Sequence, residues 1–221
     1  MKHLATVAAR STWLFNMLEL NPKGQRLFPY LTDALTEQYD FDDQPEPSTD
    51  ATSSDKQVGT KFKNGQFDSK SGPVVVSLDL YDDGLAAVTS HSSEVTDEFI
   101  RHAISWAEST FSLKFDPSLV VNRIYVSEVV VKLSGSLADR LKPLGAFADL
   151  LSSHSFGKPP QPFSPSGITF TSGDGSTTFT LDRRTNTPVS ANVFYSRALT
   201  DTATHLTLLS DLEQILGGSD D

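Results

Sequence analysis

The clearest alternation of apolar and polar residues lies between residues 73 and 91. Every second residue from Val74 to Leu80 is aliphatic, and the residues between them are mixed. Because successive side chains of a β-strand point to opposite faces, this pattern predicts a strand with one face in the core. The turn-forming sequence Asp82-Asp83-Gly84 follows, and a second apolar run comes after it. The segment is therefore predicted to form a β-hairpin.

The periodicity becomes helical between residues 93 and 111. Ser93 is expected to cap the first turn of this helix. Asp97 and Glu98 lie near its positive end and are predicted to pair with Arg101 and His102 on the face opposite the core. The buried stripe is predicted to contain Phe99, Ile100, Ala103, Trp106, Ala107 and Phe111.

Weaker patterns predict the other elements of the N-terminal half. A strand is expected within residues 4–15, and a helix from about Gln25 to Gln38, where apolar residues recur at helical spacing. Residues 61–67 contain Asn64-Gly65, which favours either a strand with a bulge or a small hairpin.

The C-terminal half shows the same mixture of signals. β-Branched and aromatic residues predict a strand over 122–133, and a helical pattern follows to residue 153, broken near Pro143 and Gly145. A second hairpin is expected to pair 168–171 with 177–181. The closing helix carries apolar residues at 206, 209, 212, 215 and 216, and His205 is expected to be partly exposed. No internal repeat of fixed period is found.

Hairpins interspersed with helices predict an α+β fold, with a mainly antiparallel sheet built from hairpins and three to four helices packed mostly on one face. We expect residues 1–39 and 59–216 to form one main domain, and 217–221 to be a disordered acidic tail. Residues 40–58 are expected to be an acidic flexible loop or linker. They are either an acidic docking segment or a solvated loop, and their composition favours the loop because they can bury very little.

The net charge of −10 is concentrated in two places. Residues 40–55 contain six acids and no Lys or Arg, and Asp220 and Asp221 add two more acids. The rest of the chain is therefore close to neutral. We expect neither a nucleic acid nor a membrane as partner, because both need a concentrated basic surface.

The chain contains no cysteine, which excludes disulfides and cysteine nucleophiles and fits a reducing compartment. No apolar run reaches the roughly 18 residues of a membrane-spanning helix. Arg10 interrupts the first apolar stretch too early for a secretion signal. A cytoplasmic location is therefore expected.

The acids around the first hairpin form one candidate site. Asp79, Asp82, Asp83 and His91 are near one another along the chain, and carboxylates with an imidazole suit a divalent metal ion. The alternative is that Asp-Asp-Gly serves only the turn, and turn chemistry accounts for its spacing. Asp79 and His91 have no such local role and are the weak catalytic candidates. They support the hypothesis of a metal-assisted hydrolase or nuclease, whose divalent metal would be the one cofactor; no other cofactor is predicted.

Arginines form a second candidate site, for an anion. Arg183 and Arg184 end the predicted second hairpin, and Arg197 follows later in the chain. Paired guanidinium groups bind phosphate or carboxylate in bidentate fashion, which gives the hypothesis of a small-anion or nucleotide binder. The alternative, which we favour, is that these residues form ordinary ion pairs with nearby acids.

Motifs of known catalytic chemistry are absent from the sequence. Neither glycine-rich phosphate-loop pattern occurs, the five histidines are scattered, and no G-x-S-x-G elbow is present. Enzyme activity is therefore uncertain and is the weaker expectation. The leading hypothesis is a non-enzymatic protein–protein interaction or assembly protein, with a protein partner or a homo-oligomer as its complex.

Overall fold

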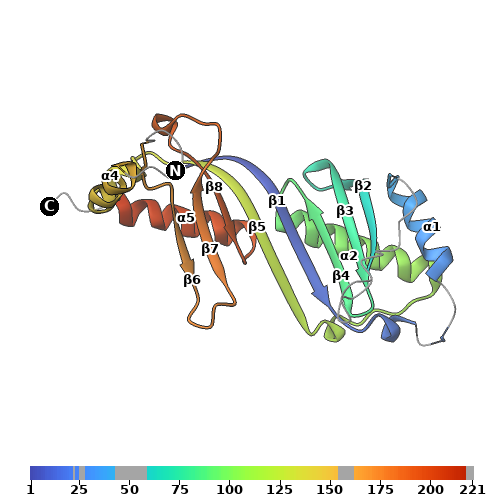
Figure 1. The fold of residues 1–221 in the computed structure, drawn as a ribbon. Helices are drawn as coiled ribbons and strands as arrows, with labels where there is room; N and C mark the ends of the chain where they lie inside the picture. Colours follow the sequence, from blue (N-terminus) through green and yellow to red (C-terminus); the bar gives the residue numbers. More distant parts are fainter. Residues whose placement is uncertain (22, 25–27, 43–58, 154–161, 218–221) are drawn as a thin grey trace. The chain divides into compact units, whose positions relative to one another are not determined.

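A computed structural model describes residues 1–21, 23–24, 28–42, 59–153 and 162–217 of the chain. It is an α+β fold with eight antiparallel β-strands, which confirms the predicted fold class (Figure 1). Most of the predicted linker, at 43–58, and the last four residues of the predicted tail, at 218–221, lie outside the described residues. Within the described part, no helix is long and apolar enough to cross a membrane.

The elements follow one another in a simple order along the chain. The strands are β1 (Lys2–Leu14), β2 (Thr60–Ser69), β3 (Gly72–Tyr81), β4 (Gly84–Thr89), β5 (Asn122–Lys132), β6 (Gly167–Thr171), β7 (Thr178–Arg183) and β8 (Val193–Ala198). The α-helices are α1 (Phe28–Tyr39), α2 (Ser93–Phe111), α3 (Leu137–Arg140), α4 (Gly145–Ser153) and α5 (Thr202–Gly217). Short 3₁₀ turns are η1 (Met17–Leu20), η2 (Pro117–Leu119), η3 (Lys142–Leu144) and η4 (Val189–Ala191).

The contacts within the chain divide it into two compact units. The first unit contains Thr6–Ser127 and Thr200–Ala203. The second unit contains Met1–Ala5, Glu128–Leu199 and Thr204–Asp221. Strands β1 and β5 are each divided between the two units, because the boundaries fall inside them.

The first unit is built on the predicted hairpin. Its strands are ordered β2-β3-β4-β1, and β3 pairs with β4 in the register that sets Leu80 opposite Leu85. The aliphatic face of β3 is buried as the alternation predicted, and α2 packs against the neighbouring strand β4. Phe99 and Ile100 of α2 are fully buried in this core.

A bulge in β2 resolves the ambiguity around Asn64-Gly65 in favour of a strand. The register with β3 shifts between Phe62 and Gly65, and Asn64 has a positive φ of 54°. The ring of Phe41 lies where a side chain at position 65 would be, at 2.4 Å from an ideal Cβ. Glycine is therefore needed at this position for Phe41 to cover the edge of the sheet.

The second unit has its own sheet and core. Its strands are ordered β5-β8-β7-β6, and the second hairpin pairs Ile168 with Leu181 as predicted. Leu181, Phe194 and Leu209 are almost fully buried and belong to one cluster. The predicted break in the helical segment is also found, because η3 at Pro143 separates α3 from α4.

The two halves of the chain repeat one topology, β-α-β-β-β-α, although the sequence shows no fixed period. Strands β1 to β4 correspond to β5 to β8, and the strand order within each unit is the same. One hydrogen bond occurs twice at equivalent places. Phe15 N–H, just after β1, donates to Asp83 O at 2.9 Å, and Leu133 N–H, just after β5, donates to Asn192 O at 3.0 Å. Each acceptor residue directly precedes the last of three consecutive strands: Asp83 precedes β4, and Asn192 precedes β8. The repeat therefore lies in the order of the elements and not in the residues.

Two local expectations are wrong. Ser93 is the first residue of α2 and does not cap it; its hydroxyl accepts the Thr202 N–H at 2.8 Å, and Thr202 Oγ1 accepts the Ser93 N–H at 3.1 Å. His205 is fully buried instead of partly exposed.

The turn of the first hairpin gives a direct test of this fold. Gly84 has a φ of 150°, and a Cβ there would lie 2.1 Å from the backbone oxygen of Trp13. Gly84→Ala should therefore lower the free energy of unfolding by about 2 kcal/mol. Gly145 has helical angles and open space around it, so Gly145→Ala should raise this free energy by about 0.5 kcal/mol. Urea denaturation measures both, and equal effects of the two variants would contradict the described hairpin packing.

Candidate interaction surface

The acids predicted around the first hairpin have structural partners or are exposed. Asp79 Oδ2 accepts hydrogen bonds from Arg10 Nη2 and from the Tyr81 hydroxyl, both at 3.3 Å. Asp82 and Asp83 are exposed at the turn, where their backbone carbonyls accept the N–H groups of Met17 and Phe15. Asp79 therefore has two structural partners, of which Arg10 is distant in the sequence.

His91 lies just beyond β4 and is exposed. No group of three or more His, Cys, Asp or Glu residues in the described part of the chain is arranged to hold a metal ion. The proposed ligand set of Asp79, Asp82, Asp83 and His91 therefore stays a prediction from sequence, without a geometry that supports it.

The three candidate arginines do not converge. Arg183 lies opposite Phe194 in the β7–β8 pair, so both side chains belong to the face that also carries buried Leu181. Arg197 is three residues after Phe194 on β8 and points to the other face, where its Nε lies 3.5 Å from Glu128 Oε1. Arg184 is exposed just after β7. An anion site that uses Arg183 and Arg197 together would need both faces of one sheet.

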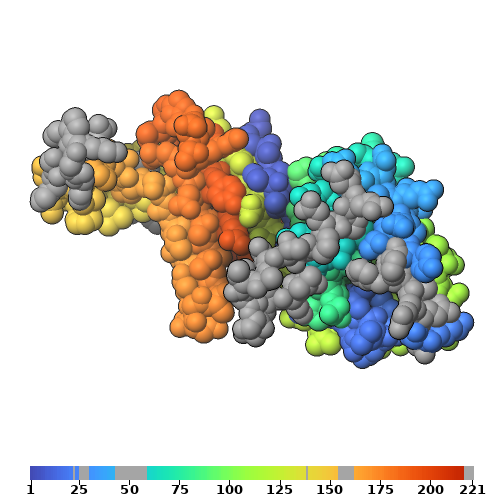
Figure 2. Space-filling model, turned by 45° about the vertical axis from the view of Figure 1, so that its right-hand side comes forward, coloured from blue at the N-terminus to red at the C-terminus, as the bar shows by residue number. Residues whose placement is uncertain are grey.

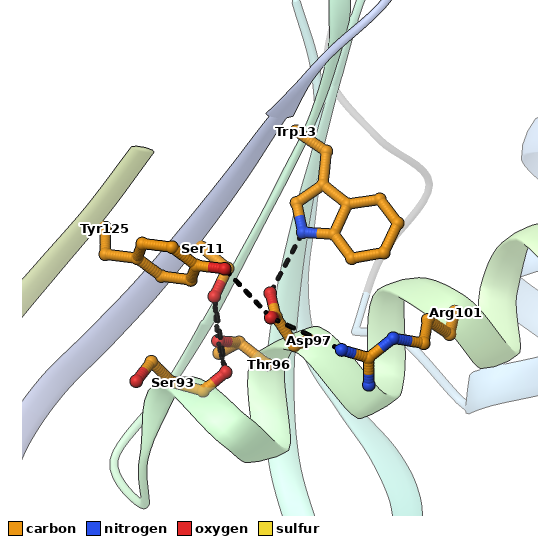
Figure 3. A network of polar contacts seen from close by, with 7 residues as sticks. All are labelled: Ser11, Trp13, Ser93, Thr96, Asp97, Arg101 and Tyr125. Carbon is orange, nitrogen blue, oxygen red and sulfur yellow. Dashed lines mark hydrogen bonds and ion pairs between the residues drawn. The ribbon is translucent and has the colours of Figure 1, made fainter. Parts of the chain in front are cut away.

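The densest polar network is centred on Asp97 of α2, as Figure 3 shows. Asp97 is only 8% exposed. Its Oδ1 accepts from Trp13 Nε1 at 2.9 Å, and its Oδ2 accepts from the Tyr125 hydroxyl at 3.0 Å. The predicted ion pair with Arg101 is present at 3.5 Å, but Asp97 points inward and not to the solvent-facing side. Both carboxylate oxygens are occupied, so this network fixes α2 against β1 and β5.

Cationic and hydroxyl groups extend this network. The guanidinium of Arg123 lies 4.0 Å above the ring of Trp13, a distance typical of a cation–π contact. Beside it, Ser11 Oγ and Thr96 Oγ1 are 2.6 Å apart, which joins β1 to α2 a second time. The other predicted helix pair is replaced by different partners. His102 Nδ1 lies 2.8 Å from the Tyr39 hydroxyl, and Glu98 accepts the Lys70 N–H at 3.2 Å.

Removal of the Asp97 carboxylate should destabilise the first unit strongly. Asp97→Ala leaves the Trp13 N–H and the Tyr125 hydroxyl without an acceptor, and we expect a loss of about 3 kcal/mol in the free energy of unfolding. Glu94→Ala removes an exposed acid from the same turn of α2 and should cost about 0.5 kcal/mol. Urea unfolding followed by tryptophan fluorescence, from Trp13 and Trp106, compares the two variants. A loss below about 1 kcal/mol for Asp97→Ala would show that the network does not anchor the helix.

His205 is the corresponding buried polar residue of the second unit. Its Nε2 lies 2.9 Å from Ser196 Oγ, while its Nδ1 has no hydrogen-bond partner among the described residues. Burial lowers the pKa of His205 to about 4. The sequence did have a signal for this burial, because His205 is four residues before Leu209 and so shares its face of α5.

This pKa shift predicts an acid-sensitive stability. The unfolded chain binds a proton at His205 below about pH 6.5, but the folded chain does so only near pH 4, so stability falls as the pH drops through this window. His205 should account for about 2 kcal/mol of lost stability between pH 7 and pH 5. Urea unfolding at both pH values should show that His205→Gln removes this part of the pH dependence. His91→Gln, at an exposed site, should leave it unchanged; the same slope in all three proteins would contradict the burial of His205.

Apolar side chains gather at the surface of the second unit. Leu144, Phe147 and Leu150, on and beside α4, are 53%, 61% and 53% exposed, and they recur at helical spacing. Phe170 of edge strand β6 is 53% exposed. The N–H of Phe163 donates to Ser152 Oγ at 2.8 Å and so ties the segment before β6 to α4. The space-filling view shows the gold residues of α4 and the orange residues of β6 and β7 at the surface (Figure 2). We call Leu144, Phe147, Leu150 and Phe170 the apolar surface.

The corresponding helix and edge strand of the first unit bury several large apolar side chains, although Tyr30 of α1 is 69% exposed. Helix α1 and the residues after it contribute Leu35, Tyr39 and Phe41, which are 3%, 3% and 5% exposed. Phe62 of edge strand β2 lies opposite Leu78 and is fully buried, whereas Ile168 of β6, opposite Leu181, is only partly buried. The first unit thus buries Phe62 of its edge strand β2. The second unit leaves Ile168 of its edge strand β6 only partly buried and Phe170 exposed.

The chain matches no protein-family model and no curated protein. The helical spacing of Leu144, Phe147 and Leu150 was visible in the sequence, but spacing alone does not tell whether a helix face is covered. The buried apolar residues on the corresponding elements of the first unit provide this comparison.

Proposed function

We propose that this protein is a non-enzymatic interaction or assembly protein, and that the apolar surface of the second unit is where it binds another protein. One observation carries the proposal: Leu144, Phe147, Leu150 and Phe170 are more than half exposed, whereas Leu35, Tyr39 and Phe62 on the corresponding elements of the first unit are buried. Exposed large apolar side chains that recur on one helix face, as Leu144, Phe147 and Leu150 do, commonly mark binding sites. Aromatic side chains such as Phe147 and Phe170 are also enriched in the centres of protein interfaces.

Burial of these apolar side chains by a partner would be more favourable than their exposure to water. Burial of one Leu or Phe side chain is worth about 1.5–3 kcal/mol. Burial of the exposed parts of four such side chains would contribute to the free energy of a contact, against an association cost on the order of 4–15 kcal/mol. The cytoplasm, the expected compartment of this cysteine-free chain, would be the place of this contact.

The alternative functions gain no observation of their own. Asp79 is bound by Arg10 and Tyr81, which gives it a structural role in place of a metal-assisted one. Arg183 and Arg197 lie on opposite faces of their sheet, so the anion hypothesis rests on Arg184 with only one of them. Neither alternative function is supported by an observation as direct as the exposure of the apolar surface.

Site-specific photo-crosslinking in the native host tests the proposal. A photoreactive amino acid in place of Phe147 should form adducts of defined mass with a protein, because this position would lie inside the interface. The same residue in place of Ser105, exposed on α2 of the first unit, is the control and should form none. Leu150→Ser should reduce the adduct yield at position 147 about tenfold, since it removes an apolar contact from the same surface.

The folded stability of this variant separates binding from folding. Because Leu150 is exposed, Leu150→Ser should change the free energy of unfolding by less than about 0.5 kcal/mol. Equal adduct yields at positions 147 and 105, or a yield that Leu150→Ser leaves unchanged, would refute the interaction function of this surface.

A further inference from the structure

Strand β6 ends the sheet of the second unit, and no described strand pairs with its outer edge. Two hydrogen bonds to β7 fix which backbone groups face outward: Arg183 N–H donates to Ser166 O at 2.8 Å, and Ser172 N–H donates to Thr177 O at 2.9 Å. Residues 166, 168, 170 and 172 therefore bond inward, because the inward and outward groups alternate along an antiparallel strand. The N–H and C=O groups of Gly167, Thr169 and Thr171 point away from β7, and no other described strand lies beside them.

The edge of the first unit carries the protection that β6 lacks. Strand β2 contains Lys61 and Lys63, and its bulge at Asn64 interrupts a regular edge. Asp42 also pairs with Lys63, where Asp42 N–H donates to Lys63 O at 2.9 Å. Charges, bulges and covering segments are the usual means that prevent strand addition. Strand β6 has no charged residue, no proline and no register shift.

We propose that β6 pairs with β6 of a second copy of this chain, antiparallel and centred on Thr169. This inference rests on the proposed function, for which it names the partner. A twofold axis at Thr169 sets Thr169 opposite its own copy and Gly167 opposite Thr171. All three are residues with outward backbone groups, so the pairing forms about six hydrogen bonds over the whole length of the strand.

The side chains are complementary in the same register. Ile168 lies opposite Phe170 of the second copy, on the face that carries Leu181 and Phe179, and this contact occurs twice. A β-branched residue beside an aromatic one is a favourable cross-strand pair, and the other face places threonine against threonine. Phe170, 53% exposed in the single chain, becomes covered.

Charge favours a second copy at this edge over the edge formed by β2. Two chains of net charge −10 repel each other in general, so they need a neutral contact. The strand Gly-Ile-Thr-Phe-Thr is neutral at every position, and a twofold axis through it brings no like charges together. The same operation on β2 would bring two copies of its lysines close to one another.

Single cysteines test the pairing cleanly, because the chain has none of its own. In the proposed register the two copies of position 169 lie about 5.5 Å apart between Cα atoms, within the range of a disulfide. The two copies of position 171 lie about 13 Å apart, four residues of strand rise. Under mild oxidation the full-length Thr169→Cys protein should form a disulfide-linked dimer at least about tenfold faster than the Thr171→Cys protein. Equal rates would overturn the register.

Light scattering after size-exclusion chromatography tests the dimer itself. The wild type should elute at twice the chain mass of 24.1 kDa, and Thr169→Pro, which removes only an outward N–H, should raise the dimer Kd at least about tenfold. If the proline variant does not fold, Thr169→Lys should weaken the dimer in a salt-dependent way, while Ser105→Lys in the first unit should not. A wild type that is monomeric up to its solubility limit overturns the inference. If adducts at position 147 still form with a monomeric wild type, the proposed interaction function stands and only the β6 dimer is ruled out. If the dimer forms but no adduct appears at position 147, the dimer stands and the interaction function of α4 is ruled out.

Discussion

A β-sheet with one apolar face must have that face covered, and the rest of this structure follows from how each half of the chain meets this requirement. The first unit meets it completely: α2 and α1 lie over β2, β3 and β4, and Phe41 closes the edge above Gly65. The second unit repeats the topology, but its core cluster is formed mainly by residues of β5, β7, β8, α3 and α5. Leu144, Phe147, Leu150 and Phe170, on and beside α4 and on β6, remain more than half exposed, and this difference is the basis of the proposed function.

Buried polar groups fix each helix to its sheet from the same helix position, although to strands that do not correspond, β1 and β8. The fourth residue of α2, Thr96, lies within 2.6 Å of Ser11, and the fourth residue of α5, His205, lies within 2.9 Å of Ser196. Such contacts cost desolvation if they are left unpaired, so they specify one position for the helix. In the first unit Asp97 adds three further partners, which makes it the stronger of the two anchors.

The elements that could be predicted from the sequence are those whose pattern depends only on residues close by in the chain. The alternation from Val74 to Leu80, the break at Pro143 and both hairpins each depend on neighbours in the chain, and the structure has them as expected. The roles of Asp79 and Asp97 depend on Arg10 and Trp13, which are far away in the sequence, so local reasoning assigned one to a metal and the other to a surface pair. The division into two units and the exposure of Phe147 and Phe170 depend on tertiary packing alone.

Hydrogen–deuterium exchange resolved to single strands, measured on dilute and on concentrated wild-type protein, shows whether a second chain completes the edge formed by β6. If it does, the outward amides of Thr169 and Thr171 exchange more slowly as the concentration rises, while those of β2 do not change. Exchange in β6 that is independent of concentration would rule out this pairing.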